Sequence, residues 1–268
     1  MSIAPAESSR NSRRRAAETV ISHGAEAVTH HKRLLLAEDD PINQMACKTI
    51  MQKLGYSCDV VNNGVEALKA LAERPYDLVL MDCMMPEMDG FETTAVIRAP
   101  ESNVLNHAVP VIALTARTVA GDHEACLAAG MSDYLKKPLR SHDLKQMLDK
   151  WLPDSPADDG NQPECEICQH EQFTDDKEVI ALFIAKAPGY VTAMGNSVCE
   201  GNAPEIQRHA HRLAGAAQAI GAITCAGLVS EMEQYGKSNN PIMVAQKMHY
   251  LSEAFTELLT ALKQRSCK

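Results

Sequence analysis

Five short apolar runs alternate with amphipathic stretches between Arg33 and Leu152, and this alternation constrains the fold more than any other feature. The apolar runs are RLLLAE, SCDVV, DLVLMD, VPVIALT and DYLKK, each of strand length. Helical stretches are predicted to begin near Pro41, Gly64, Gly90, Gly121 and Arg140. Strands that alternate with helices form parallel sheets covered on both faces, so residues 33–152 are predicted to form a doubly wound α/β domain with a five-stranded parallel sheet.

The sequence changes character after this domain. The stretch PDSPADDGNQPE is rich in Pro, Asp and Gly and has no apolar period, so residues 153–170 are predicted to be a linker. From residue 171 to residue 268 no strand-like alternation occurs, and helical runs are punctuated by Gly and Pro. We therefore expect an antiparallel, all-α helical bundle over residues 171–268.

Charge and composition narrow the class of protein. The formal net charge of −9 argues against a general nucleic-acid binder, which would present a basic face. Residues 1–32, which contain SSRNSRRR, are predicted to be a basic, mostly disordered arm; the alternative is contact with an acidic lipid or a partner. No long apolar run and no secretory signal is present, so we expect a cytoplasmic protein without membrane insertion. The nine cysteines, Cys165 and Cys168 of the CEICQH stretch included, are predicted to be reduced thiols.

Polar side chains gather at the predicted strand ends. The ends of the first, third, fourth and fifth strands carry Glu38, Asp39, Asp40, Asp82, Thr115 and Lys137. The carboxyl ends of parallel strands share one edge, where open α/β sheets bind ligands. Crowded carboxylates are the ligands of a hard cation such as Mg²⁺. Carboxylates, a hydroxyl and an ammonium around such a cation are what phosphoryl transfer requires, since that chemistry depends on positioning and on neutralising oxygen charge.

These residues resemble the receiver domain of two-component response regulators and hybrid sensor kinases. The matching motifs, in order along the chain, are LLLAEDDPINQ, DLVLMDCMMPEMDGFE, PVIALTA and AAGMSDYLKKPL. The resemblance implies that Asp82 is the phosphoacceptor. It also implies that Glu38, Asp39 and Asp82 hold Mg²⁺ together with the carbonyl group of Met84.

The resemblance implies further roles at the same edge. Lys137 would pair with the phosphoryl oxygens, and its peptide bond to Pro138 is often cis in the family. Thr115 would hydrogen-bond the phosphoryl group, and Tyr134 would reorient with it as a switch. Asp40, which directly precedes Pro41, is predicted to cap the following helix rather than to bind metal.

The second domain contains an unusual helix, HAHRLAGAAQAIGA. The residues of its predicted core face recur at helical spacing and are Ile206, Ala210, Leu213, Ala217 and Ile220. His211 lies on another side together with Ala214 and Gly215, where glycine weakens a helix by roughly 1 kcal/mol. Small residues one turn from a histidine leave room for a second surface to approach it.

HRLAGAAQAIGA resembles the signature of histidine phosphotransfer (HPt) domains, and the runs around it resemble their four-helix bundle with an extra N-terminal helix. The resemblance implies that His211 carries the phosphoryl group and that Gly215 gives access to it. The alternative is a surface histidine packed against a neighbour. The family usually has lysine where this chain has Ala214; we expect Arg208, three residues before His211, to supply the positive charge.

The two domains together predict a phosphorelay intermediate. Asp82 would accept a phosphoryl group from an upstream sensor histidine kinase, and His211 would exchange it with an aspartate of a response regulator. No ATP-binding kinase core occurs in the sequence, so the chain would depend on a separate kinase or be the C-terminal portion of a hybrid kinase. The alternative is a binding switch in which phosphorylation of Asp82 alters the receiver surface while the helical domain docks partners.

Overall fold

The computed structural model of the protein describes residues 32–115, 120–152 and 174–266. These residues belong to one compact unit, Lys32–Lys268. The predicted linker and the CEICQH stretch lie outside the described residues, as does the predicted basic arm apart from Lys32.

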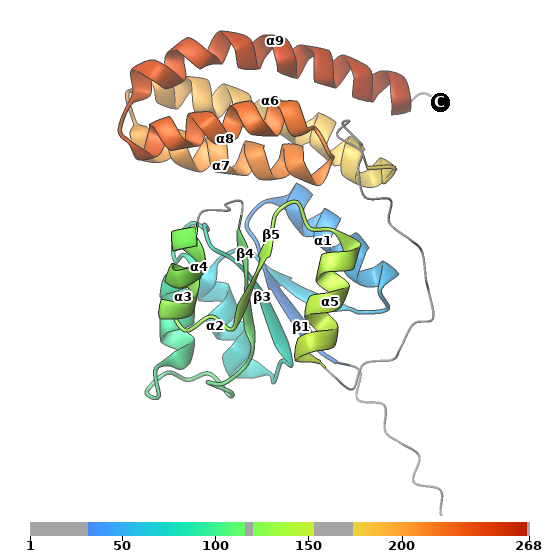
Figure 1. Ribbon diagram of the computed structural model, residues 1–268, viewed down its shortest axis with the longest axis vertical. Coiled ribbons are helices and arrows are strands. Elements are labelled where there is room, and N and C mark those ends of the chain that lie inside the picture. Colours follow the sequence, from blue (N-terminus) through green and yellow to red (C-terminus); the bar gives the residue numbers. More distant parts are fainter. Residues whose placement is uncertain (1–31, 116–119, 153–173, 267–268) are drawn as a thin grey trace, which may run out of the picture. The chain divides into compact units, whose positions relative to one another are not determined.

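The first part of this unit is built on a parallel sheet (Figure 1). Its strands are β1 (Leu34–Ala37), β2 (Cys58–Val61), β3 (Leu78–Asp82), β4 (Val111–Thr115) and β5 (Asp133–Lys136). They pair in the order β2-β1-β3-β4-β5, and every pair is parallel. The predicted five-stranded α/β fold is confirmed. Strand order reverses between β1 and β3, so this sheet edge has the topological switch point at which open α/β sheets bind ligands.

Helices cover the two faces of the sheet (Figure 1). They are α1 (Pro41–Lys53), α2 (Gly64–Glu73), α3 (Gly90–Arg98), α4 (Ala120–Ala128) and α5 (Ser141–Trp151). Alternate strand residues point to opposite faces. The core under α2, α3 and α4 contains Leu35, Ala37, Val79, Met81, Val111 and Ala113, and the core under α1 and α5 contains Leu34, Leu36, Leu78, Leu80, Ile112 and Leu114.

Side-chain caps fix where the helices start. Asp40 accepts hydrogen bonds from the backbone N–H groups of Ile42 and Asn43, so its predicted role as the cap of α1 is confirmed. Asp89 and Glu92 form a reciprocal capping box at the start of α3. These caps hold the loops that follow β1 and β3 close to the strand ends.

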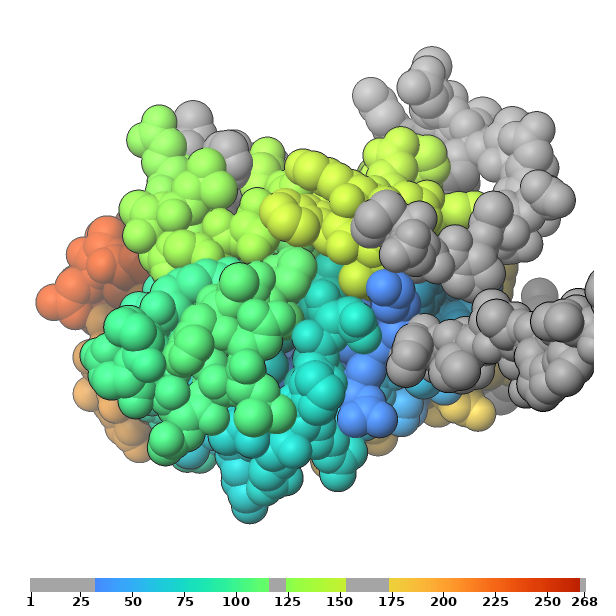
Figure 2. Space-filling view, turned by 90° about the horizontal axis from the view of Figure 1, so that it is seen from below, coloured from blue at the N-terminus to red at the C-terminus, as the bar shows by residue number. Residues whose placement is uncertain are grey.

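Figure 2 shows the end of the sheet at which the strands begin, opposite their carboxyl ends. There the start of the described chain, in blue, and the segment before β4, in green, lie at the surface. Asp77 accepts a hydrogen bond of 2.7 Å from the backbone N–H of Arg33, which ties the entries of β1 and β3 together.

The second part is a bundle of four helices within residues 174–266. They are α6 (Lys177–Cys199), α7 (Ala203–Ala219), α8 (Ile223–Lys237) and α9 (Pro241–Ser266). Phe183, Leu213 and Leu251 are fully buried in its core, and Phe183 lies with its ring centroid 6.1 Å from that of Phe255. The predicted helical bundle is confirmed. Among the described residues, no helix combines the length and apolarity needed to cross a bilayer.

One predicted boundary is wrong. Gly and Pro were predicted to separate the helical runs of this region, and Pro188 is one such residue, but α6 continues through it. Phe183 and Ala187 before the proline and Met194 after it are all buried in the bundle core. Their burial outweighs the roughly 3 kcal/mol that an interior proline costs a helix. Residues 174–266 therefore contain four helices, and the extra N-terminal helix expected from the resemblance does not precede α6 within them.

We predict that Gly90→Ala destabilises the protein. A Cβ atom at Gly90 would lie 2.3 Å from the backbone carbonyl oxygen of Asp82, and backbone cannot move aside as a flexible side chain can. Urea denaturation should give a free energy of unfolding lower by about 1–3 kcal/mol. Gly189→Ala is the control, because no atom lies within 4 Å of its added Cβ and alanine favours a helix. Equal stability of the two variants would contradict the prediction.

Candidate functional site

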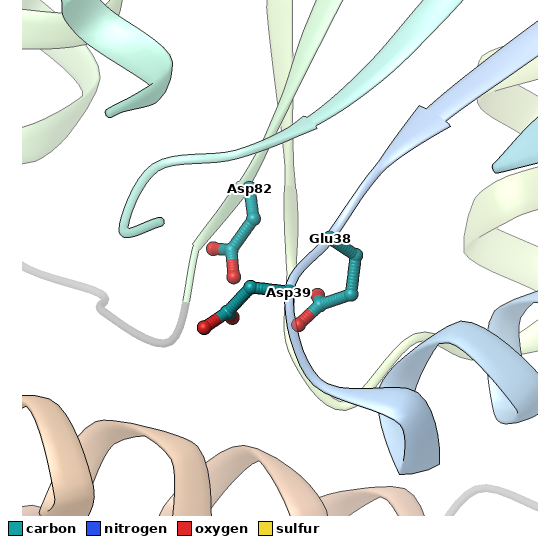
Figure 3. A group of neighbouring side chains, drawn as sticks. All are labelled: Glu38, Asp39 and Asp82. Carbon is teal, nitrogen blue, oxygen red and sulfur yellow. The ribbon is translucent and has the colours of Figure 1, made fainter. Parts of the chain in front are cut away.

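Three carboxylates meet at the carboxyl edge of the sheet. Glu38 and Asp39 follow β1 and Asp82 ends β3, and Figure 3 shows their side chains converging. One oxygen from each lies within 4.8 Å of the others. Glu38 and Asp82 are each only 1% exposed. The predicted cluster of carboxylates is present, and its oxygens are the ligand type that a hard divalent cation prefers.

Lys137 is buried between two of these carboxylates. Its Nζ lies 2.6 Å from Oε2 of Glu38 and 2.9 Å from Oδ2 of Asp82. It follows β5, and its peptide bond to Pro138 is cis, as the resemblance implies. Lys137 thus bridges the carboxyl ends of β1 and β3.

The charges in this cluster shift one another's pKa values. Burial opposes ionisation of Asp82, but the positive charges of Lys137 and His211 outweigh it and hold the pKa of Asp82 well below its usual range. Burial and the negative charge of Asp82 raise the pKa of Glu38 to about 8. Asp82 is therefore an ionised carboxylate at neutral pH.

Local hydrogen bonds hold Glu38 in place. Its Oε1 accepts a 3.0 Å hydrogen bond from Nδ2 of Asn43, and its backbone carbonyl accepts one of 2.6 Å from Nε2 of Gln44. Both donors lie in the first turn of α1, which Asp40 caps. The capped helix start thus fixes the carboxylate that holds Lys137.

The other predicted residues of this edge surround the cluster at different depths. Thr115 ends β4 and is 7% exposed, whereas Tyr134 on β5 is 40% exposed. The backbone N–H of Met84 lies 3.4 Å from Oδ1 of Asp82. Thr115 is placed near the buried site, and Tyr134 presents its ring to the surface.

His211 on α7 faces this edge. Its Nε2 lies 3.9 Å from Oδ1 of Asp82, and its side chain is 11% exposed. Its Nδ1 lies 3.5 Å from Oε2 of Glu233 on α8. Burial opposes a charged imidazole, but the two carboxylates outweigh it and raise the pKa of His211 to about 10. Each ring nitrogen of His211 thus faces one carboxylate.

Close packing brings α7 to the start of α1. Gly215 lies against Asn43, and a Cβ atom at Gly215 would come within 2.7 Å of Nδ2 of Asn43. Ile42 is fully buried within the core of the helical bundle. Gly215, which was predicted to clear a surface beside His211, is therefore packed against the α/β domain of the same chain, and Ala214 is fully buried in the bundle core.

A cavity of about 370 Å³ lies beside His211. Met84 and Thr115 line it from the α/β domain, and His211 and Lys237 line it from the bundle. The cavity leaves room next to the imidazole and the threonine hydroxyl.

Comparison with known families matches each half of this arrangement. Residues 34–149 match the response regulator receiver domain, and residues 178–265 match the Hpt domain. The chain carries a receiver domain followed by an Hpt domain. This combination belongs to phosphorelay signalling.

The chain is also similar to parts of longer proteins. Probable histidine kinase 1 of Oryza sativa subsp. indica is 36% identical over 149 residues, which cover 45% of this chain and 15% of the relative. Hybrid signal transduction histidine kinase B of Dictyostelium discoideum is 42% identical over 131 residues; the match covers 45% of this chain and 7% of the relative. A crystal structure of the receiver domain of a Pseudomonas aeruginosa sensor histidine kinase, with magnesium in its active site cleft, is 41% identical. It covers 46% of this chain and 98% of its own, with a TM-score of 0.42.

Two residues of the Hpt domain near His211 were not predicted from the sequence. Glu233 contacts the imidazole, and its other oxygen lies 3.0 Å from Nζ of Lys237 one turn later on α8. Oppositely charged residues four apart are common on helix surfaces, so this spacing alone does not mark a functional site. Only the packing of α8 against α7 brings them to His211.

Two arginines of α7 have different partners. Arg208 pairs with Glu205, and its side chain is 45% exposed. Arg212 was not predicted to be a site residue. Its Nε donates a 2.7 Å hydrogen bond to Oδ2 of Asp39. The predicted support of a phosphohistidine by Arg208 stays a prediction, and the structure offers Lys237 as a cation beside the same cavity.

We predict that Lys137→Met destabilises the receiver domain. Breaking a buried ion pair leaves charge uncompensated and costs about 3–5 kcal/mol. Urea denaturation in chelator-treated buffer at pH 7 measures the loss. Burial and the charge of Asp82 already raise the pKa of Glu38; without the ammonium it rises further, and the pKa of Asp82 is no longer held below its usual range. Protonation at lower pH relieves this, so the difference from wild type should shrink toward pH 5.

Lys136→Met is the matched control, because Lys136 is exposed on the preceding position of β5. Its free energy of unfolding should stay within about 0.5 kcal/mol of wild type. A Lys137→Met protein as stable as this control would contradict the assigned role of Lys137.

Proposed function

We propose that this chain is a phosphorelay intermediate in which Asp82 accepts a phosphoryl group and His211 exchanges it with an aspartate. The observation that carries the proposal is the opposition of the two residues, with Nε2 of His211 3.9 Å from Oδ1 of Asp82. The phosphoryl donor would be the phosphohistidine of an upstream sensor histidine kinase, and a downstream response regulator would be a further partner.

The first step is nucleophilic attack by the Asp82 carboxylate on phosphorus. A new P–O bond forms, the P–N bond of the donor phosphohistidine breaks, and its electron pair returns to the imidazole nitrogen. The lowered pKa of Asp82 keeps the attacking oxygen unprotonated. Lys137, 2.9 Å from Asp82, would offset the negative charge of the transferring oxygens. Thr115 would hydrogen-bond the acyl phosphate, and Tyr134 would reorient with it.

Glu38, Asp39 and Asp82 would hold Mg²⁺, with the carbonyl group of Met84 as a further ligand. Their oxygens lie within 4.8 Å of one another, and an all-oxygen donor set suits this cation. When bound, Mg²⁺ would supply positive charge against the carboxylates and the phosphoryl oxygens.

The second step takes place between the two domains. The Asp82 carboxylate, which helps to raise the pKa of His211, is esterified in the acyl phosphate, so Nε2 of His211 can lose its proton to solvent. Nε2 then attacks phosphorus, the P–O bond to Asp82 breaks, and the electron pair stays on the carboxylate. Glu233, 3.5 Å from Nδ1, favours the proton on that nitrogen and leaves the lone pair on Nε2. Gly215 permits the close approach of α7 to the receiver that this step requires.

A second candidate is a phosphorylation-controlled binding switch in which the Hpt domain only docks partners. Two observations favour it. Ala214 stands where the family usually has lysine, and Tyr134 is exposed on the receiver surface. Phosphohistidine formation separates the two candidates.

We predict a defined order of labelling with radiolabelled acetyl phosphate, a small-molecule acyl phosphate. The wild type should carry label on Asp82 and, as an alkali-stable phosphoramidate, on His211. Asp82→Asn should lose both signals, and His211→Gln should keep only the acyl phosphate. His209→Gln is the control, since His209 pairs with Glu205, and should label like the wild type. Phosphohistidine in Asp82→Asn would overturn the order, and its absence from the wild type would favour the binding switch.

We also predict that labelling depends on a divalent cation. Removal of divalent cations with EDTA should reduce labelling of Asp82 by at least about tenfold, because the remaining carboxylates repel the incoming phosphoryl group. Addition of Mg²⁺ should restore it in the wild type but much less in Asp39→Asn. Full labelling in EDTA would remove the metal from the proposal.

A further inference from the structure

We infer that Arg212 of the Hpt domain and a divalent cation are alternative partners of Asp39, so that docking of the Hpt domain weakens Mg²⁺ binding by the receiver. This inference rests on the proposed function, because that function makes Asp39 a metal ligand. Mg²⁺ affinity tests it separately from phosphoryl transfer.

The contact between Arg212 and Asp39 joins the two domains. Nε and Nη2 of Arg212 both donate to Oδ2 of Asp39, the Nε contact at 2.7 Å. The Asp39 side chain is 5% exposed, and that of Arg212 is 27% exposed. A guanidinium–carboxylate pair with two N–H donors is among the stronger charge-assisted contacts in proteins.

Side-chain cations already balance the carboxylates of the cluster. Lys137 contacts Glu38 and Asp82, whereas Arg212 is the cation in contact with Asp39 among the described residues. Arg212 therefore neutralises the carboxylate that Lys137 does not reach. A divalent cation on the same carboxylate would bring its charge against the guanidinium, and the two positive charges repel each other.

Several contacts keep Arg212 at this position while the domains are docked. His211, the preceding residue, faces Asp82, and Gly215 one turn later lies against Asn43. Burial opposes the charge of Arg212, but Asp39 and Asp40 raise its pKa further, so the side chain is a permanent cation here. The same docking of α7 that presents the histidine to Asp82 therefore presents the guanidinium to Asp39.

Linkage makes the effect reciprocal. If docking lowers Mg²⁺ affinity by some factor, Mg²⁺ lowers docking affinity by the same factor. The metal-free receiver is then the form that holds its own Hpt domain most tightly. A metal-loaded receiver holds it less tightly and is freer to meet another phosphodonor.

Mg²⁺ titrations of the full chain by calorimetry test this inference. Arg212→Ala should bind Mg²⁺ about three- to tenfold more tightly than the wild type. Without the guanidinium, Asp39 is free to bind the metal in a larger fraction of the molecules. Arg208→Ala is the matched control. It removes one arginine from the same helix, but Arg208 pairs with Glu205 rather than with the receiver, so the wild-type affinity should remain.

The outcomes distinguish failure of this inference from failure of the proposed function. Equal Mg²⁺ affinity in the wild type and Arg212→Ala overturns the competition and leaves the proposed function standing. If Arg208→Ala gains as much Mg²⁺ affinity as Arg212→Ala, the competition is also overturned, because a change in net charge would then explain both gains. Absence of Mg²⁺ binding in all three proteins removes the metal from the proposed function, and the inference fails with it.

Discussion

The placement of Lys137 between two buried carboxylates is the interaction on which the site depends. Its ammonium lies within 2.9 Å of both Glu38 and Asp82, which come from different strands and would otherwise repel each other. Three features of the fold position these groups: β1 and β3 are adjacent and parallel, Asp40 caps the start of α1, and Lys137 directly follows β5. Lys137 thus joins two strand ends and also stabilises the ionised form of Asp82, as the proposed function requires.

The strands and the edge cluster were predictable because the physics is local or topological. Alternate strand residues such as Leu34 and Leu35 must face different cores, and that period is visible in the sequence. Parallel strands bring their carboxyl ends together, so Asp39, Asp82 and Lys137 were expected at one edge without knowledge of any distance.

The contacts of the Hpt domain were less predictable, because they depend on how helices pack against neighbours. Glu233 and Lys237 belong to α8, and only the position of α8 beside α7 brings them near His211. Arg208 and Arg212 are one turn apart, and sequence spacing alone did not distinguish the one that reaches the receiver. Pro188 was read as a break because the buried residues on both sides of it contribute through tertiary packing.

The burial of Ile42 in the bundle core has a consequence for partner choice. The receiver and Hpt domains share one chain, so their contact is intramolecular, whereas contact with another protein depends on that protein's concentration. Under the proposed function, a receiver of another protein would reach His211 only after this intramolecular contact opens. Release of the internal receiver therefore sets the threshold for exchange with any external one.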